Sequence, residues 1–523
     1  MKKIFSFIIV LALCALQMQA QNEQSQRELA QSPLRKLQLA EFAIANLYVD
    51  KVDEVKLVED AIRGMLEELD PHSAYSNAEE VKRMNEPLQG NFEGIGVQFN
   101  MVEDTLFIIQ PVSGGPSEKV GILAGDRIVT VNDTTIAGVK MSREEIMRRL
   151  RGPKGTQVKL GIKRHGFSEL LTFDVIRDKI PLHTIDAAYL IRKGIGYVRI
   201  SSFGATTHTE FVDAVTQLKK QGMKHLVLDL QGNGGGYLNA AVDIANEFLE
   251  ADELIVYTHG LRSPRREFKA QGNGGLRKGK VVVLIDEFSA SASEIVSGAI
   301  QDWDRGLVVG RRSFGKGLVQ RPLDLPDGSM IRLTVARYYT PAGRCIQKPY
   351  EDKKKYKDDL NDRLSKGELI HADSIHFPDS LKYQTRKKGR IVYGGGGIMP
   401  DHFIPLDTTR YNKYHRDLAA KGCIINTCLR YIDTHREELD KRYKDFDTYN
   451  KQFEITPKML RQLVENGKKS GVKYDEKLYE EALPLLKVQM KALIARDLWE
   501  MNEYFRIINE TNESVAKAIE LLQ

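Results

Sequence analysis

The sequence predicts a multidomain α/β protein: a parallel-sheet domain that follows or encloses a small β domain, with helical regions at both ends. Three observations support this prediction. Hydrophobic residues make up 42% and charged residues 28% of the 523 residues, which is ordinary globular usage and sufficient for several cores. Short apolar strands alternate with helical segments over residues 195–309. Glycine-rich short strands fill residues 87–178, and helical spacing dominates residues 21–86 and 409–523.

The first twenty residues have the features of a secretory signal peptide. Lys2 and Lys3 precede an apolar run over residues 4–16, which is too short for the roughly 20 residues that span a bilayer. Cleavage is expected after Ala20, so we predict a periplasmic or otherwise exported protein. Cys14 follows a bulky leucine rather than a small residue, and lipid anchoring there is not expected.

Charge and motif spacing exclude several classes of protein. The formal charge of +6 is spread along the chain, whereas nucleic-acid binding needs a concentrated basic face. Residues 310–317 resemble a P-loop, but Gly317 stands where Ser or Thr would hold Mg²⁺, so an NTPase is not expected. The cysteines after the leader have no metal-binding spacing, and Cys423 and Cys428 either close a small loop or lie in a helical core. We expect no metal and no cofactor.

Residues 179–408 are expected to form one domain around a parallel sheet. Short apolar strands joined by helices imply a sheet that is covered on both faces. In such sheets the active site lies at the carboxyl ends of the strands, where two turns occur, around residues 232 and 290. Residues 346–390 are charged and poor in apolar residues, and we expect a mobile insertion there.

A serine-rich turn over residues 289–293 opens a helix directly after a buried strand. A serine at a helix N-terminus lies beside N–H groups without intrahelical partners, which suits a nucleophile and half of an oxyanion hole. Ser291 and Glu294 also fit a capping box, and the presence of three serines leaves the choice among them open.

Two further segments could contribute to the same site. The glycine loop over residues 232–236 could bring backbone N–H groups to a ligand, although it also fits a plain turn into a helix. Lys316 lies between two glycines after a buried strand, either as an exposed loop residue or as a desolvated general base. The 11 histidines are scattered, so a Ser–His–Asp site has no support from spacing.

In the small β domain, a glycine-containing loop over residues 92–97 precedes a strand. Consecutive N–H groups of such a loop can bind the C-terminal carboxylate of a peptide, while the strand edge pairs with the peptide backbone. An ordinary turn of a small β domain gives the same pattern.

The motifs, taken together and in order, resemble those of the carboxyl-terminal processing peptidases, the tail-specific serine proteases of the S41 type. The resemblance covers residues 40–405. It rests on Ser-Ala-Ser-Ala-Ser-Glu-Ile at 289–295 and on Phe-Gly-Lys-Gly at 314–317 with Gln320. The family's PDZ domain is matched by Gly-Ile-Gly at 94–96, by Ala-Gly-Asp-Arg-Ile at 124–128 and by residues 142–155. The glycine loop departs from the family pattern, because a glycine replaces its usual proline.

The resemblance implies a fold and a set of residue roles. The fold is an S41 peptidase core of the ClpP/crotonase-like class with a PDZ domain at 87–178. The lysine lies 25 residues after Ser291, which matches the family's Ser–Lys dyad and selects this serine. The remaining implied site residues are Gln320, which supports the lysine, Asp302, which is counted with the site in some members, the oxyanion donors Gly235 and Ala292, and the peptide-binding loop Gly94, Ile95, Gly96 and Val97.

We therefore expect an exported serine endopeptidase that recognises protein C-termini through its PDZ domain. Expected partners are proteins or peptides with apolar free C-termini, and the sequence is compatible with a homo-oligomer and with peripheral membrane association. The rival interpretations are a PDZ scaffold with an inactive peptidase-like core and a histidine-dependent hydrolase.

Overall fold

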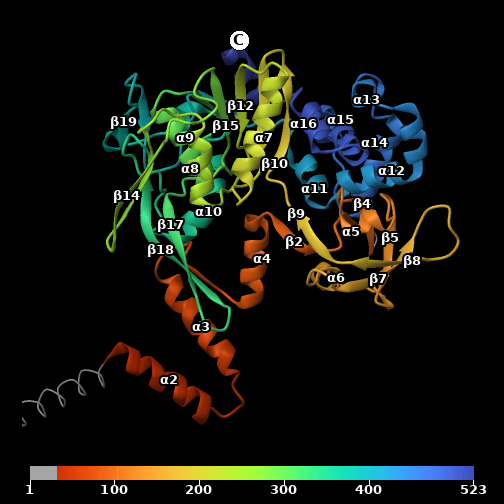
Figure 1. The fold of residues 1–523 in the computed structure, drawn as a ribbon, viewed down its shortest axis with the longest axis horizontal. Helices are drawn as coiled ribbons and strands as arrows, with labels where there is room; N and C mark the ends of the chain where they lie inside the picture. Colours follow the sequence, from red (N-terminus) through yellow and green to blue (C-terminus); the bar gives the residue numbers. More distant parts are fainter. Residues whose placement is uncertain (1–31, 103) are drawn as a thin grey trace, which may run out of the picture. The chain divides into compact units, whose positions relative to one another are not determined.

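The computed structural model describes residues 32–102 and 104–523, so the predicted signal peptide and Cys14 lie outside the described residues. The chain forms two compact units (Figure 1). One comprises residues up to 78 together with 321–333, and the other comprises 79–320 and 334–523.

The first unit is mainly helical, in line with the helical spacing of its sequence. Ser32 caps α2 (Pro33–Leu47) and Asp53 caps α3 (Glu54–Glu67), each through its side-chain oxygen. The strand β1 (Ala74–Ser76) pairs antiparallel with the first residues of β18 (Met330–Tyr339). None of the residues of α2 is buried.

The second unit begins with α4 (Ala78–Gln89) and contains the small β domain. Antiparallel strands are ordered β3-β4-β5-β7-β8, and β6 pairs with β5. Their bounds are Val97–Val102, Thr105–Pro111, Arg127–Val131, Gln157–Lys163 and Leu171–Ile176, with Thr134–Thr135 for β6. The helices α5 (Pro116–Lys119) and α6 (Arg143–Leu150) belong to the same domain. A separate two-stranded ribbon of β2 (Asn91–Gly94) and β9 (Asp178–Pro181) leads into and out of the domain.

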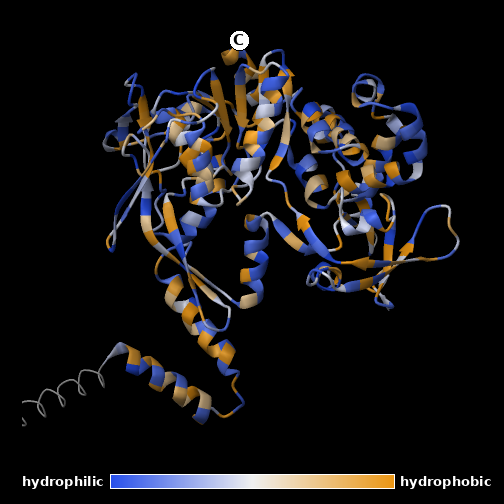
Figure 2. Ribbon diagram, viewed as in Figure 1, coloured by the Kyte–Doolittle hydropathy of each residue, from blue (hydrophilic) through white to orange (hydrophobic). Residues whose placement is uncertain are grey.

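The peptidase-like part of the second unit is built on a six-stranded sheet of order β10-β11-β12-β15-β16-β21. Its strands are Ile185–Arg192, Ile195–Ile200, His225–Asp229, Val281–Ile285, Leu307–Gly310 and His402–Phe403. All neighbours are parallel except β10 and β11. Figure 2 shows hydrophobic residues concentrated in these strands. The parallel sheet predicted from the sequence is confirmed.

Both faces of this sheet are covered by helices. One face packs against α7 (Thr207–Lys220), α8 (Leu238–Asn246) and α9 (Ala292–Asp302). The other face packs against α16 (Met501–Ile508) and α17 (Glu513–Leu522), with Phe505, Val515, Ala518 and Leu522 in the cluster. Successive residues of β15 alternate between the two clusters, as the period of two along a strand requires. The last two helices of the chain therefore complete the core of the peptidase domain.

Outside the six-stranded sheet, β13 (Leu254–Gly260) pairs with β14 (Ser263–Lys269) and with the end of β18. The sequence pattern does not predict this hairpin. Its residues include charged side chains on the exposed β14, which hide the strand pattern.

Residues 346–390, the segment expected to form a charged insertion, contain regular secondary structure. They include α10 (Lys353–Ser365), two short 3₁₀ helices and the strand β19 (Lys382–Gln384), which pairs with β20 (Ile391–Tyr393). The buried Arg363 donates to the carbonyl oxygens of Ser313 (3.2 Å) and Arg312 (2.7 Å). A charged side chain of this segment thus contacts the loop that leads to Lys316.

The remaining C-terminal helices form a cluster of their own. They are α11 (Lys413–Ala420), α12 (Cys423–Arg442), α13 (Phe446–Gln452), α14 (Pro457–Lys469) and α15 (Glu476–Leu498). Cys423 and Cys428 are both buried in α12 and unpaired, so the interpretation as helical core cysteines holds. Among residues 32–102 and 104–523, no helix combines the length and the hydropathy of a membrane span.

Candidate active site

Ser291 occupies the sharp turn between β15 and α9, at the carboxyl edge of the parallel sheet. Its backbone has φ +57° and ψ −111°, a conformation that residues other than glycine rarely adopt. Strain of this kind persists where the surroundings fix the residue, and it accompanies nucleophiles at strand-to-helix turns. Ser291 is also the N-cap of α9, so the N–H groups of the first helical turn lie near it.

The other two serines of the turn are engaged in the core. Ser289 and Ser293 are fully buried, whereas Ser291 is partly exposed. The Ser289 hydroxyl donates to the Leu230 carbonyl at 2.8 Å, and the Ser293 hydroxyl donates to the Asn233 carbonyl at 2.8 Å. Of the three hydroxyls, the geometry therefore favours Ser291 as a nucleophile.

The glycine loop passes directly beside Ser291. A Cβ atom at Gly235, where φ is +103°, would lie 2.8 Å from the Ser291 Cβ and 3.1 Å from the Ala292 nitrogen, so only glycine fits. The structure thus brings Gly235 and Ala292 together at Ser291. In this conformation the Gly235 N–H points at Asn233 Oδ1 and donates a hydrogen bond to it at 2.8 Å.

The carboxylate of Glu294 connects the serine turn to the lysine loop. Its Oε2 accepts the backbone N–H groups of Ser291 (2.8 Å) and Lys316 (2.9 Å). Its Oε1 accepts the Gly315 N–H at 2.7 Å and the Ser313 hydroxyl at 2.5 Å. Glu294 is fully buried, so these four donors replace its entire hydration. Ser291 and Lys316, which are 25 residues apart in the sequence, are therefore fixed to one side chain.

Burial raises the pKa of Glu294 to about 7, although the hydrogen bonds from Ser313 and from the three backbone N–H groups oppose this rise. The folded protein therefore binds the proton of this group more tightly than the unfolded chain does. Between the ordinary pKa of a glutamate and about pH 7, the contribution of Glu294 to folding stability falls as the pH rises.

Tyr338, near the end of β18, holds the same two segments from another side. Its hydroxyl lies within hydrogen-bond distance of the Lys316 carbonyl and 3.2 Å from the Ser291 carbonyl. Burial raises the pKa of Tyr338 well above its ordinary value, and the neighbouring Glu294 adds to the effect. The tyrosine therefore stays protonated and remains a donor.

Gln320 lies in β17 (Leu318–Asp324), on the strand that continues from Lys316. Its Nε2 atom is buried and has no hydrogen-bond partner among the described residues. A buried amide group of this kind is available to a neighbouring acceptor or to a bound substrate.

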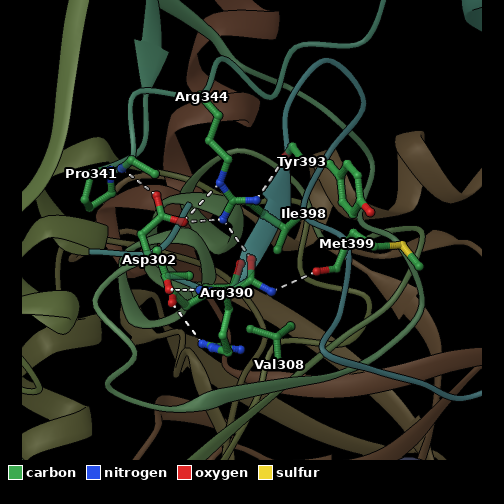
Figure 3. Close-up of polar contacts among 12 residues, drawn as sticks. Asp302, Val308, Pro341, Arg344, Arg390, Tyr393, Ile398 and Met399 are labelled. Carbon is green, nitrogen blue, oxygen red and sulfur yellow. Dashed lines mark hydrogen bonds and ion pairs between the residues drawn. The ribbon is translucent and has the colours of Figure 1, made fainter. Parts of the chain in front are cut away.

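Asp302 lies at the opposite end of α9 from Ser291, about 16 Å along the helix axis at about 1.5 Å per residue. Figure 3 shows its carboxylate held by the guanidinium of Arg344, with Nε at 3.0 Å and Nη2 at 2.6 Å, and by the Ala342 N–H at 2.8 Å. Arg344 also donates to the Tyr393 carbonyl at 2.9 Å. The structure therefore does not bring Asp302 to the serine and places it in a buried ion pair that anchors α9.

The histidines of the core lie in other environments. His208 contacts Glu247 at 2.9 Å, and the His225 Nδ1 accepts the Lys280 N–H at 3.0 Å. Within the described part of the chain, no hydrogen bond joins a histidine to Ser291. The geometry gives no support to the histidine-dependent hydrolase.

Comparison with known sequences assigns four segments of the chain. Peptidase family S41 matches residues 194–353 and a PDZ domain matches 94–176. The activating protease CtpB N-terminal domain matches residues 11–80, and a family of unknown function matches 414–500. The peptidase match contains the serine turn, the glycine loop and Lys316.

Curated relatives extend these matches across domains. The chain is 36% identical over 318 residues to the carboxy-terminal processing protease CtpA of Bacillus subtilis (strain 168), covering 61% of this chain and 67% of that protein. It is 36% identical over 319 residues to the carboxy-terminal-processing protease of Bartonella bacilliformis, covering 59% and 73%. The chain belongs to the carboxy-terminal processing protease family. A solved structure, the photosystem II D1 C-terminal processing protease, is 29% identical with a TM-score of 0.36, and covers 71% of this chain and 93% of that one.

The two family matches confirm the predicted S41 core and PDZ domain. In this carboxy-terminal processing protease the predicted peptide loop lies beside an open sheet edge. Gly94 ends β2 and Val97 begins β3, which is the edge strand of the PDZ sheet. Between them, the Ile95 carbonyl accepts hydrogen bonds from the N–H (3.1 Å) and hydroxyl (2.7 Å) of Ser117, and Gly96 has φ +72°. The loop is therefore fixed in shape next to a strand that can pair with a peptide.

Sequence reasoning missed the two groups that organise the protease site. In the sequence, Glu294 indicates only a capping box, because its contacts with residues 313–316 depend on a loop that is distant along the chain. Tyr338 carries no local signal at all. Asn233, which accepts the Gly235 N–H, could have been suspected from its position within the glycine loop.

Replacing Glu294 with glutamine should reduce kcat by about 100-fold or more, since misplacing a catalytic group by about 1 Å costs roughly that much. A glutamine has only one acceptor oxygen, so either the N–H groups of Ser291 and Lys316 or the donors of Ser313 and Gly315 would face an N–H₂ group, and the alignment of the two segments would be disturbed. Ser297→Ala, one turn along α9, is the matched control and should retain most activity. Turnover of Glu294→Gln at the parental rate would show that the carboxylate does not organise the site.

Proposed function

We propose that this protein is an exported serine endopeptidase that binds the free C-termini of its substrates and cleaves them with a Ser291–Lys316 dyad. The observation that carries the proposal is the Glu294 carboxylate, which accepts the backbone N–H groups of both residues at 2.8 and 2.9 Å. Membership of the carboxy-terminal processing protease family supports the class of reaction.

In the proposed mechanism, Ser291 Oγ attacks the carbonyl carbon of the scissile peptide bond while the neutral amine of Lys316 accepts the hydroxyl proton. The carbonyl oxygen becomes an oxyanion beside the Ala292 N–H and the Gly235 segment. The C–N bond then breaks, and the lysine ammonium gives its proton to the leaving amine. Water then attacks the carbonyl carbon of the acyl-serine while Lys316 accepts a proton from the water. The bond between this carbon and Ser291 Oγ breaks, Lys316 returns the proton to Oγ, and the new carboxyl terminus is released.

Two local features support the roles of the neighbouring residues. The Gly235 N–H donates to Asn233 in this structure, so it becomes an oxyanion donor only if the loop turns it towards the substrate. Gln320 follows Lys316 on the same segment with a buried amide, which suits the role of positioning the lysine. Asp302 contributes through the anchoring of α9 rather than through the reacting atoms.

Tail recognition is proposed for the PDZ domain. The loop Gly94–Val97 supplies backbone N–H groups for a carboxylate, and the unpaired edge of β3 pairs with the extended tail. The apolar side chains Val97, Phe99 and Met101 pack against the core of the domain along this strand, which favours an apolar last residue of the substrate.

Export is proposed from the leader sequence, which predicts removal of residues 1–20. Protein isolated from cells with an N-terminus at Met1 would contradict this proposal.

Ser291→Ala should abolish cleavage of an unfolded protein substrate while leaving the fold intact, since loss of a cap costs only about 1 kcal/mol. A fluorophosphonate probe should label the parent at Ser291 and leave this variant unlabelled, as shown by peptide mapping. Ser289→Ala is the control and should keep most activity because its hydroxyl serves the core. A folded parent that neither cleaves nor reacts with the probe would indicate an inactive scaffold.

A substrate peptide with a free C-terminus should be cleaved with a kcat/KM at least about tenfold higher than its amidated form. Amidation removes the charge-assisted hydrogen bonds to the loop, each worth roughly 1.5–3 kcal/mol. The comparison uses one sequence with an apolar last residue. Equal values for the two peptides would show that the PDZ domain does not read the C-terminus.

A further inference from the structure

One strand of the PDZ domain is apolar on both faces. In β4, Leu106 and Ile108 point into the core of the domain, whereas Phe107 and Ile109 belong to a second buried cluster with Leu429 of α12. Phe107 is 4% exposed, Ile109 9% and Leu429 2%. An antiparallel sheet can leave one face to water, so the burial of the second face reflects a specific partner. That partner is the C-terminal helical domain.

Polar contacts surround this apolar cluster and select one face of α12. The Arg127 guanidinium binds the Asp433 carboxylate at 2.5 Å and lies 5.2 Å from the centre of the Phe107 ring. The Asn100 amide donates to Asn426 Oδ1 at 3.4 Å. Leu429 and Asp433 follow Asn426 by three and seven residues, which places the three side chains on one side of the helix. We call this set, with Ile425, the α12 stripe.

The other end of the helical domain is attached to the peptidase core. The α12 residue Cys428 contacts the backbone of α15 at Met490, and α15 packs against α16, which covers the parallel sheet together with α17. Asn512 and Ser514, at the start of α17, contact the side chain of Gln231 at 3.4 and 3.5 Å. Gln231 leads into the glycine loop that lies beside Ser291. The helical domain thus spans from the PDZ sheet to the active-site loop.

The two chain segments that connect the PDZ domain to the rest of the unit restrict its orientation less than this interface does. The domain enters and leaves through β2 and β9, which pair only with each other within the described residues. A two-stranded ribbon has little independent stability, so it does not define an orientation by itself. The α12 stripe contacts the outer face of β4 and the side chain of Asn100 on β3, and within the described residues the backbone edge of β3 stays unpaired. Docking therefore fixes the domain without using the proposed peptide edge.

We propose that residues 414–500 are a docking platform that holds the PDZ domain in place, so that a bound C-terminal tail presents the rest of the substrate to Ser291. The proposal assigns a role to the segment that matches a family of unknown function. It rests on the proposed function of the PDZ domain in reading tails. Holding the recognition domain at a fixed position raises the effective concentration of the substrate at the cleavage site.

The test is a charge exchange across the interface. Arg127→Asp and Asp433→Arg each place like charges together, and the double variant restores an opposite pair. Glu465→Arg, on an exposed position of α14, makes the same charge change as Asp433→Arg away from the α12 stripe and is its matched control. Two quantities are measured: amide hydrogen exchange of residues 105–111, and the ratio of kcat/KM for the free-acid and amidated peptides.

Each single variant should increase exchange in residues 105–111 and lower the free-acid to amidated ratio about tenfold, towards one. Both effects should be reversed in the double variant and absent in Glu465→Arg. The Kd of a fluorescent free-acid peptide for the Ser291→Ala forms should stay unchanged, because the peptide edge is not touched.

Unchanged exchange in the single variants would overturn the docking contact. Increased exchange with an unchanged ratio would overturn the delivery role, and so would a loss of ratio that the double variant fails to restore. A parent that cleaves both peptides equally would instead overturn the proposed tail recognition, and this result is seen before any interface variant is made.

Discussion

The hydrogen bonds of the Glu294 carboxylate join the two halves of the active site. The serine turn follows β15 and the lysine loop follows β16, so the sheet brings the two strand ends together. Strand pairing does not by itself fix the positions of Ser291 and Lys316. Glu294 supplies that last alignment through the N–H groups of Ser291, Gly315 and Lys316. Because the side chain is fully buried, loss of these donors would leave a carboxylate without hydrogen bonds, at a large cost in free energy. The two loops therefore stay in contact with Glu294.

Neighbouring residues also hold the serine turn and the lysine loop together. Tyr338 holds the carbonyl side of the same two residues, and Asn233 ties the glycine loop to the serine turn through the Ser293 hydroxyl and the Ala290 N–H. From outside, Arg363 of α10 holds the carbonyls of Arg312 and Ser313. The charged segment 346–390 thus contributes to the position of Lys316. The C-terminal helices α16 and α17 cover the other face of the sheet and share its hydrophobic core.

Much of the fold followed from local sequence pattern. The apolar strands of the parallel sheet are short and continuous, and the serine turn and glycine loop fall where two of them end, so the place of the site was predictable. The hairpin β13–β14 was not, because charged residues interrupt the alternation of its outer strand. The packing of α16 and α17 on the sheet depends on contacts across about 300 residues of chain, which periodicity does not report.

The candidate site, like the fold, could be predicted from the sequence only in part. Ser291 could be chosen among three serines only through its spacing to Lys316, and its strained backbone and partial exposure now support that choice on physical grounds. The resemblance also implied a place in the site for Asp302, whereas the structure puts it in an ion pair at the far end of α9. Glu294 stood beside the serine in sequence, yet its function depends on a loop that only the fold brings near.

The central claim is that a neutral lysine, held beside Ser291, serves as the base. Its most direct test is the pH dependence of kcat/KM for the parent and for Lys316→Arg, each confirmed to be folded. A lysine base must lose its proton to act, so parental kcat/KM should rise with pH and then level off, while the arginine variant, which stays protonated, should be inactive at every pH. Normal turnover by Lys316→Arg, with activity abolished instead by replacing His208, His225 or His259, would contradict the account.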